Sequence, residues 1–439
     1  MNSQDVELTK GEYVREENIA DFLISLVKQD SKPAMGCTEP VAIAYCAYVA
    51  SREINRGEIQ SIDVELSRSI FKNAKAVKIP GTGRSGIDYS TALGVGVDNV
   101  ESPLLIFEKV DDDLMKQANE MLENRLIKVS IVDDVSGVYV ACKIKADKEV
   151  VATVSHAHDH IEEVKVDGEV IYSHHGLKPE SSSANSFEIT DLTVNELIEI
   201  ADTIDYDLIR FTLEGIDINM AAYEEGMKGY GLGLGKGLKA IGKGNIDTMS
   251  LEKKIRTITA AAVDMRMGGG KLPIMTSGGS GNQGIGVILT LYLVSLEENI
   301  SDERLARALF FAHCLNHYIK NYSGKLSGMC GCGIASSVSA AAGIVYMLGG
   351  NYEQIAGACA NVYGNLTGLV CDGAKESCSL KLSTSSAEAM LSAYLALSNV
   401  IAEENVGVLG TTLEETIMNI GKLSTKSFVE VDEAIVDMI

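Results

Sequence analysis

The sequence is poor in positive charge. Its 439 residues include 38 Lys and Arg against 61 Asp and Glu, which gives a formal net charge of −23 at pH 7. A chain of this sign repels nucleic-acid phosphates and anionic membrane surfaces, and no basic patch in the sequence offsets the repulsion. We therefore expect no nucleic-acid partner and no membrane partner.

Long hydrophobic runs are also missing. The most apolar stretches, "GIGVILTLYLVSL" and "GIASSVSAAAGIVYML", carry Ser or Gly and fall short of the roughly 20 residues of a membrane-spanning helix. The amino-terminal stretch is acidic and polar, without an apolar run behind a basic head, so it does not resemble a secretory signal. These features predict a cytoplasmic protein whose apolar stretches are buried core helices.

Nine cysteines in a protein that is not exported indicate free thiols, metal ligands or catalytic thiols, because disulfides are rare in a reducing compartment. Four of them lie in apolar helix-like or strand-like runs and are expected to be small buried hydrophobes: Cys46, Cys142, Cys314 and Cys359. The other five lie in turns or directly before a helix: Cys37, Cys330, Cys332, Cys371 and Cys378.

Hydrophobic periodicity divides the chain into three blocks. Residues 1–60 hold two helical patterns, the second starting at Pro40, and residue 37 lies just before it. Residues 61–190 form a strand-rich α+β domain with a linker, and the Asp-Gly pair of "EVKVDGEVIY" predicts a hairpin. Residues 191–439 form a mostly helical domain. The expected fold is α+β: a small strand-rich N-terminal unit with flanking helices, followed by a larger, mostly helical catalytic domain.

The turn cysteines suit a soft metal centre, because backbone amides in turns can point at sulfur ligands. Cys330 and Cys332 have one residue between them, and Cys371 and Cys378 have six. Structural zinc sites usually take closely spaced pairs in both halves, so this spacing does not fit one. An iron–sulfur cluster, another metal, and packed or redox-active thiols all stay open on spacing alone.

Several motifs carry a family resemblance. "GMCGCGIASSVSAAAG" and "GLVCDGAKESCSLKL" resemble the paired cysteine motifs of the α chain of iron–sulfur-dependent L-serine dehydratases. "GCTEP", "FKNAKAVKIPGTGRSG" and "TSGGSGNQGIGVIL" resemble the L-cysteine desulfidase branch of that superfamily. The resemblance implies a [4Fe–4S] cluster held by three cysteines with one iron open to substrate, and no pyridoxal phosphate. Cys371 and Cys378 match the late ligands, and the early ligand falls on Cys330 or Cys332, with Cys330 favoured.

The implied reaction is β-elimination of L-cysteine to pyruvate, hydrogen sulfide and ammonia. It removes the Cα proton and expels a leaving group from Cβ, and an open iron acts as the Lewis acid for that group. L-Serine dehydratase with the same cluster is the first alternative, and a non-catalytic iron–sulfur redox sensor is an alternative of another class. A pyridoxal-phosphate enzyme is disfavoured, because no lysine is singled out for a Schiff base. The expected partner is a small amino acid, and a homo-oligomer stays open because this class often self-associates.

Cys37 is the expected proton acceptor. A thiolate placed just before a helix start is favoured by the positive end of the helix dipole, and the resemblance points to the same "GCTEP" cysteine. Glu39 either orients Cys37 or caps the helix, and capping is the favoured interpretation.

Substrate-binding residues are expected in two Gly-rich turns. "SGGSGNQG" offers backbone amides with Ser280 and Asn282, which suit a carboxylate near a helix start, and "PGTGRSG" offers Thr82 and Arg84. In "FKNAKAV", Asn73 and Lys75 match a family motif and are either substrate contacts or solvated strand residues.

The histidines give a weaker pattern. A two-residue period places His156, His158 and His160 on one face of a strand. This face is either a zinc half-site or a polar surface that lines the substrate cleft. We favour the polar surface, with His156 as the preferred substrate-binding residue. His313 and His317 are one helical turn apart, but the segment lacks the glutamate of a metalloprotease helix. We therefore expect one of these histidines to pack in the core and the other to face polar groups.

Overall fold

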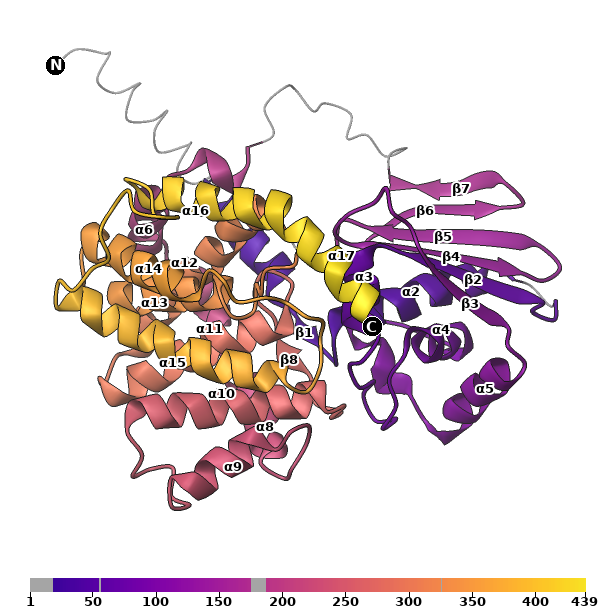
Figure 1. Ribbon diagram of the computed structural model, residues 1–439, viewed down its shortest axis with the longest axis horizontal. Helices are drawn as coiled ribbons and strands as arrows, with labels where there is room; N and C mark the ends of the chain where they lie inside the picture. The colour runs from indigo at the N-terminus through magenta and orange to yellow at the C-terminus, as the bar shows by residue number, and fades with distance from the viewer. Residues whose placement is uncertain (1–18, 55–56, 175–186, 325) are drawn as a thin grey trace, which may run out of the picture.

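The computed structural model describes residues 19–54, 57–174, 187–324 and 326–439. A smaller unit of sheet and helices lies beside a larger unit of helices (Figure 1). The predicted α+β fold class is confirmed. Much of the predicted linker, residues 175–186, lies outside the described residues.

The smaller unit is built on a six-stranded sheet in the order β3-β2-β4-β5-β6-β7. Strand β3 runs parallel to β2, and all other neighbours are antiparallel. The strands are β2 (Ser61–Leu66), β3 (Ile127–Ile131), β4 (Tyr139–Lys145), β5 (Glu149–Ser155), β6 (Ile161–Val166) and β7 (Glu169–Ser173). The predicted hairpin joins β6 to β7, and both residues of its turn, Asp167 and Gly168, have positive φ angles of 51° and 85°, as this kind of turn requires.

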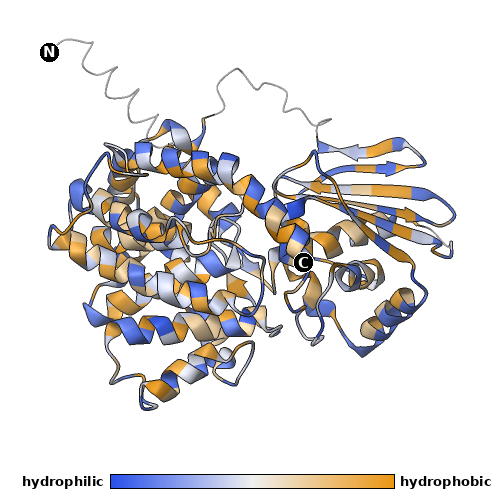
Figure 2. Cartoon of the chain, viewed as in Figure 1, coloured by the Kyte–Doolittle hydropathy of each residue, from blue (hydrophilic) through white to orange (hydrophobic). Residues whose placement is uncertain are grey.

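Alternate residues of the strands point to one buried face, which is why the sequence alternates there. Helix α2 (Thr38–Arg52) lies against this face and contributes Ala42, Ile43 and Cys46 to its core. Figure 2 shows hydrophobic residues along the strands of this sheet. The helix starts two residues before the predicted Pro40, with Cys37 in the N-cap position. The unit also contains four helices that the strand-rich pattern did not predict: α3 (Arg68–Ala74), α4 (Ile87–Gly96), the 3-10 helix η1 (Pro103–Lys109) and α5 (Asp112–Glu123).

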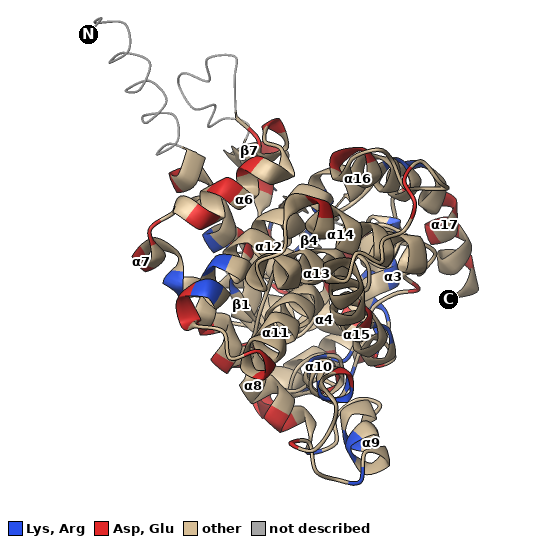
Figure 3. Ribbon diagram, turned by 90° about the vertical axis from the view of Figure 1, so that its left-hand side faces the viewer, with Lys and Arg blue, Asp and Glu red and all other residues tan. Residues whose placement is uncertain are grey.

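The larger unit packs its helices around a core rich in Ala, Ile, Leu and Val. Its central helices have few charged residues, whereas Asp and Glu line outer helices such as α6 and α8 (Figure 3). Its helices are α6 (Val194–Thr203), α7 (Tyr206–Ile209), α8 (Glu214–Gly226), α9 (Leu234–Ile241), α10 (Leu251–Met267), α11 (Gly281–Glu297), α12 (Asp302–Ser323), α13 (Ala335–Met347), α14 (Tyr352–Leu366), α15 (Cys378–Leu397) and α16 (Leu413–Lys422). Short 3-10 turns η3 (Ile189–Asp191) and η4 (Arg210–Leu213) and a π-turn η5 (Leu423–Ser427) link some of them.

Three segments tie the two units together. Residues 19–30 are helical and place Leu23 and Val27 in the core of the larger unit, although α2, the next helix along the chain, packs on the sheet. Strand β1 (Pro33–Ala34) pairs with β8 (Ile274–Met275) of the larger unit. Helix α17 (Phe428–Met438) leaves the larger unit and packs on α3 (Figure 1). The junction is therefore built from distant parts of the sequence.

Among the described residues, no helix is both long enough and apolar enough to cross a membrane.

Candidate functional site

A cavity of about 80 Å³ lies at the junction of the two units. The smaller unit contributes Cys37, Thr38, Glu39, Asn73 and His158. The polar and cysteine residues from the larger unit are Arg266, Ser280, Asn282, Gln283, Lys320, Ser327, Cys330, Cys332, Cys371, Cys378 and Lys381. A wider hollow of about 330 Å³ shares His158, Gly279 and Lys320 with this cavity. The structure thus brings together all five turn cysteines, with Asn73, Ser280 and Asn282, around one space.

The two cysteine loops are held next to each other by backbone pairing. Met329 and Val370 form an antiparallel bridge. The Cys330 N–H donates to Leu369 O at 2.8 Å, and the Cys371 N–H donates to Gly328 O at 2.8 Å. Cys378 begins α15, so it is fixed by a long helix. This pairing explains how residues 41 positions apart come to line one cavity.

Burial raises the pKa of the Cys330 thiol well above its ordinary value, and the neighbouring Cys371, Cys332 and Cys378 raise it further. Burial likewise raises the pKa of Cys378 to about 12 and that of Cys332 above normal, although Ser280 and Arg266 oppose the shift at Cys332. Sulfurs in such a group lose their protons only when a cation pairs with them, as a coordinated metal does.

The donor set fits an iron–sulfur cluster better than a single ion. Among the described residues, no three His, Cys, Asp or Glu side chains converge closely enough to hold one metal ion. In an iron–sulfur cluster each cysteine binds a different iron, so the sulfurs surround the group without meeting at a point. Four free thiols line one cavity, and the Cys330 thiol senses the charges of the other three, which meets that requirement.

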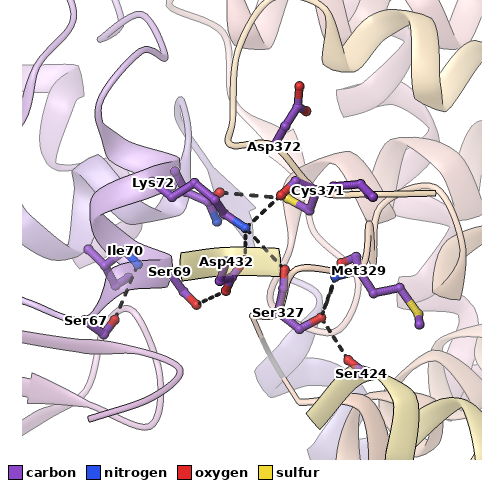
Figure 4. A network of polar contacts seen from close by, with 12 residues as sticks. Ser67, Ser69, Ile70, Lys72, Ser327, Met329, Cys371, Asp372, Ser424 and Asp432 are labelled. Atoms are coloured by element: carbon purple, nitrogen blue, oxygen red, sulfur yellow. Dashed lines mark hydrogen bonds and ion pairs between the residues drawn. The ribbon is translucent and has the colours of Figure 1, made fainter. Parts of the chain in front are cut away.

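A buried lysine of the smaller unit braces both cysteine loops (Figure 4). The Lys72 ammonium donates to the backbone oxygens of Cys371 at 2.8 Å and Ser327 at 3.4 Å. It forms an ion pair with Asp432 of α17, whose second oxygen accepts a hydrogen bond from Ser69 at 2.8 Å. The Lys72 side chain is fully buried, so one cation links α3, the two loops and the last helix.

The loop between Cys371 and Cys378 also needs a glycine where it passes α3. Gly373 has a φ of +95°, and a Cβ there would lie 2.7 Å from the backbone oxygen of Lys72. Any side chain would push the loop away from α3 and disturb the cysteine that precedes it.

Cys37 and Glu39 form a hydrogen-bonded pair at the start of α2. The Cys37 thiol donates to Glu39 Oε2 at 2.8 Å, and Asn73 Nδ2 donates to Glu39 Oε1 at 2.9 Å. Burial raises the pKa of Cys37 well above its ordinary value and Glu39 adds to the rise, and both effects oppose the one expected of the helix dipole. Burial alone would raise the pKa of Glu39 too, but His158, the Cys37 thiol and Arg266 together lower it. Glu39 is therefore the ionised partner, and its side chain turns toward Cys37.

Sequence reasoning missed Arg266 as a cavity residue, and it favoured His156 over His158. Arg266 lies in the last turn of α10, is 3% exposed, and donates from Nη1 to Asn282 Oδ1 at 2.8 Å. The signal was an arginine in the otherwise small and apolar "TAAAVDMRMGGG", a setting in which a charged residue is rarely buried without a role. His158 is 9% exposed and lowers the pKa of Glu39.

Other predicted substrate residues lie elsewhere. Thr82 and Arg84 are not among the cavity residues. Thr82 Oγ1 donates to Ile79 O at 2.9 Å and accepts from the Arg84 N–H at 3.0 Å, so it stabilises its own turn. Lys75 follows α3 directly, and with Asn73 it lies in helical rather than strand structure, because Ser67 ends β2 and caps α3.

The predicted histidine strand face is wrong. Strand β5 ends at Ser155, and His156 has a φ of +63°, so residues 156–160 turn and the two-residue period does not apply. His156 is largely exposed and faces Glu162 at 3.7 Å, away from the cavity that its neighbour His158 lines.

The two helical histidines separate as predicted into one packed and one polar-facing residue. His313 is 3% exposed and its Nδ1 lies 2.8 Å from Ser277 Oγ, and burial lowers its pKa to about 4. His317 is partly exposed and pairs with Asp30.

Comparison with known proteins gives consistent results. Residues 73–437 match the family model of the serine dehydratase alpha chain. A UPF0597 protein of Clostridium botulinum (strain Okra / Type B1) is 40% identical over 427 residues, which cover 96% of this chain and 97% of the relative. A UPF0597 protein of Caldanaerobacter subterraneus subsp. tengcongensis is 35% identical over 420 residues, which cover 95% of this chain and 98% of the relative.

Proposed function

Because this chain belongs to the serine dehydratase alpha chain family, we propose that it is an iron–sulfur-dependent lyase that converts L-cysteine to pyruvate, hydrogen sulfide and ammonia. Members of this family generally carry a [4Fe–4S] cluster and no pyridoxal phosphate. The observation that carries the proposal is the single cavity in which four cysteines of the larger unit face Cys37 and Glu39 of the smaller one.

Three of these cysteines would hold the cluster. Cys371 and Cys378 come from the late loop, and Cys330 is our choice for the third ligand, because its thiol senses the charges of Cys371, Cys332 and Cys378. Cys332 also senses Cys371, but its Sγ lies 3.7 Å from Ser280 Oγ and it senses Arg266 and Glu39, so we assign it to the substrate side of the cavity. When bound, the cluster supplies a Lewis-acidic iron for the leaving group on Cβ.

Cys37 and Glu39 would move the Cα proton. The ionised Glu39 accepts the proton of the Cys37 thiol, and the resulting thiolate takes the proton from Cα of the substrate. Asn73 holds the other carboxylate oxygen, so Glu39 keeps its orientation during the transfer. Loss of the β-substituent leaves aminoacrylate, whose imine form hydrolyses in water to pyruvate and ammonia.

A second substrate, L-serine, is favoured by the name of the matched family model. Both amino acids lose a β-substituent by the same route, and the cavity residues contain nothing that acts on only one of the two leaving groups. Cysteine is our first choice because of the early "GCTEP" and "SGGSGNQG" motifs.

Anaerobic purification followed by parallel assays tests the proposal. We expect brown protein that contains iron and acid-labile sulfide and that forms pyruvate from L-cysteine with equal release of sulfide. Faster pyruvate formation from L-serine would favour the dehydratase. A cluster that is inert to both amino acids would favour the redox sensor, and protein without iron would exclude the proposal.

We further propose a cytoplasmic location, because all nine cysteines are free thiols and a reducing compartment keeps them so. Self-association of the chain stays a prediction.

A further inference from the structure

Arg266 has an incomplete set of partners. It is 97% buried, its Nη1 is bonded to Asn282, and its Nε has no hydrogen-bond partner. Within the described ranges, it forms no ion pair with any carboxylate. A buried guanidinium that lacks a counter-ion is unfavourable, so the protein keeps this charge for a group that enters from outside.

The surroundings of Arg266 favour an anion. The guanidinium lies against the first residue of the 17-residue helix α11, where a Cβ on Gly281 would come within 2.4 Å of Nε. The first N–H groups of a helix have no partner inside it and carry the positive end of its dipole. A buried arginine and a helix start thus point to one place on the cavity wall.

The charges of the cavity identify the class of ligand. The smaller unit contributes the ionised Glu39 to the cavity, and the larger unit contributes Arg266, which is close enough to lower the pKa of Glu39. Lys320 and Lys381 also line the cavity, so about 80 Å³ contains fixed charges of both signs. Such a cavity suits a small zwitterion, whose ammonium and carboxylate are separated by a single carbon.

We propose that Arg266 binds the α-carboxylate of the amino-acid substrate and that Asn282 is a positioning residue that holds the guanidinium. The identity of the ligand as a substrate rests on the proposed function. The Asn282 side chain, predicted to contact substrate, acts here through the arginine, because its oxygen is occupied by Nη1.

The test is binding of L-alanine and L-alaninamide to anaerobically purified holoprotein by calorimetry. Neither compound has a leaving group on Cβ, so the measurement needs no turnover, and the pair differs at the carboxylate. Wild-type protein should prefer L-alanine. Arg266→Gln should weaken L-alanine binding roughly 10- to 100-fold, the effect of losing a charge-assisted pair, and leave L-alaninamide binding nearly unchanged.

Two further variants show whether a change in binding comes from the charge of Arg266 or from damage to the fold. Asn282→Asp is isosteric and gives Arg266 a permanent carboxylate partner, so it should abolish the preference for L-alanine as Arg266→Gln does. Arg256→Gln removes a partly exposed arginine from the same helix and should bind as wild type. Iron content is measured on every sample and should not change.

The inference is overturned if wild-type protein binds neither compound or binds both alike, or if Arg266→Gln and Asn282→Asp keep the wild-type preference. It is also overturned if these variants lose iron, because Arg266 would then balance the charge of the cysteine sulfurs. Holoprotein that binds L-alanine through Arg266 but forms no pyruvate from cysteine or serine would refute the proposed function and leave this inference standing.

Discussion

The cysteines of the cavity and the cysteines of the two cores differ above all in their neighbours. Their burial overlaps, because Cys37 and Cys330 are buried like the core cysteines, whereas Cys332, Cys371 and Cys378 are partly exposed. Cys46, in the core of the smaller unit, donates to the backbone oxygen of Ala152 at 3.2 Å. Cys359, in the core of the larger unit, has Val338 O at 3.9 Å. Cys37 and Cys330 are also buried, but they face a carboxylate or other thiols. For these two thiols, chemical function is thus indicated by the surrounding groups and not by the exposed fraction.

The largest expected effect is loss of the cluster, and it distinguishes the cavity cysteines from the core cysteines. Cys371→Ser and Cys378→Ser should each remove the cluster and the activity, because a hydroxyl is a poor substitute for a thiolate ligand of iron. The measurements are iron content, the visible spectrum and pyruvate formation under anaerobic conditions. Cys359→Ala is the matched core control: it should retain iron and activity and lose about 1 kcal/mol of stability. A coloured, active Cys378→Ser variant would contradict the ligand assignment.

Within the cavity class, Cys37 should behave differently from the ligands. Cys37→Ala should keep the iron and lower kcat by roughly 10²–10⁴, the usual contribution of a general base. Glu39→Gln should lower kcat in the same way, because a neutral amide cannot accept the thiol proton. The check is kcat on samples matched for iron. If Cys37→Ala lost its colour, Cys37 would have to be reassigned as a ligand.

The support of the cysteine loops should matter less than the ligands themselves. Lys72→Met leaves Asp432 without its ion-pair partner and frees the backbone oxygen of Cys371, so we expect a loss of 3–5 kcal/mol, the usual cost of breaking a buried pair. Urea unfolding and the rate of cluster loss in air measure the two effects. Lys75→Met, one residue beyond the same helix, is the control. Equal stability of the two variants would show that the brace contributes nothing.

The smallest expected effect is a change of stability with pH, caused by the buried histidine His313. The pKa of His313 is about 4 in the folded protein against an ordinary 6.5, because burial disfavours the charged ring. Between these values the unfolded chain binds a proton that the folded chain does not. Stability should therefore fall as the pH drops from 6.5 toward 4, by about 3 kcal/mol at most. His313→Gln should show a shallower decline in urea unfolding between pH 6.5 and 4.5, and an unchanged slope would exclude the contribution.

The fold class was predictable because the strands alternate and the later helices repeat every three to four residues. Helices α3 and α4 were missed because they follow strand-like or Gly-rich stretches, and Ser67 and Gly86 start them without a strong periodic pattern. The direction of α17 was also unpredictable, since its contact with α3 depends on a pairing between Lys72 and Asp432 that no local pattern reveals.

In the site, sequence motifs identified the turn cysteines, and the structure places them around one cavity. They favoured His156, whereas His158 lines the cavity, because that choice depends on where β5 ends and which side the turn faces. Arg266 lies in none of the motifs, and the signal of a charge in an apolar run gains its significance only from burial without a directly paired carboxylate. Sequence motifs can thus identify functional residues in loops. Whether a charged side chain in a cavity has a paired counter-ion is seen only in the folded structure.

The ion pair between Lys72 and Asp432 also sets an order of events during protein synthesis, because its two partners are 360 residues apart. At 5–20 residues per second the ribosome needs roughly 20–70 s to go from one to the other. During that time Lys72 has no Asp432 to pair with, so the smaller unit is not yet fixed to the two paired cysteine loops. Loading of iron should therefore follow translation of this segment, and nascent chains halted before residue 432 should take up metal poorly.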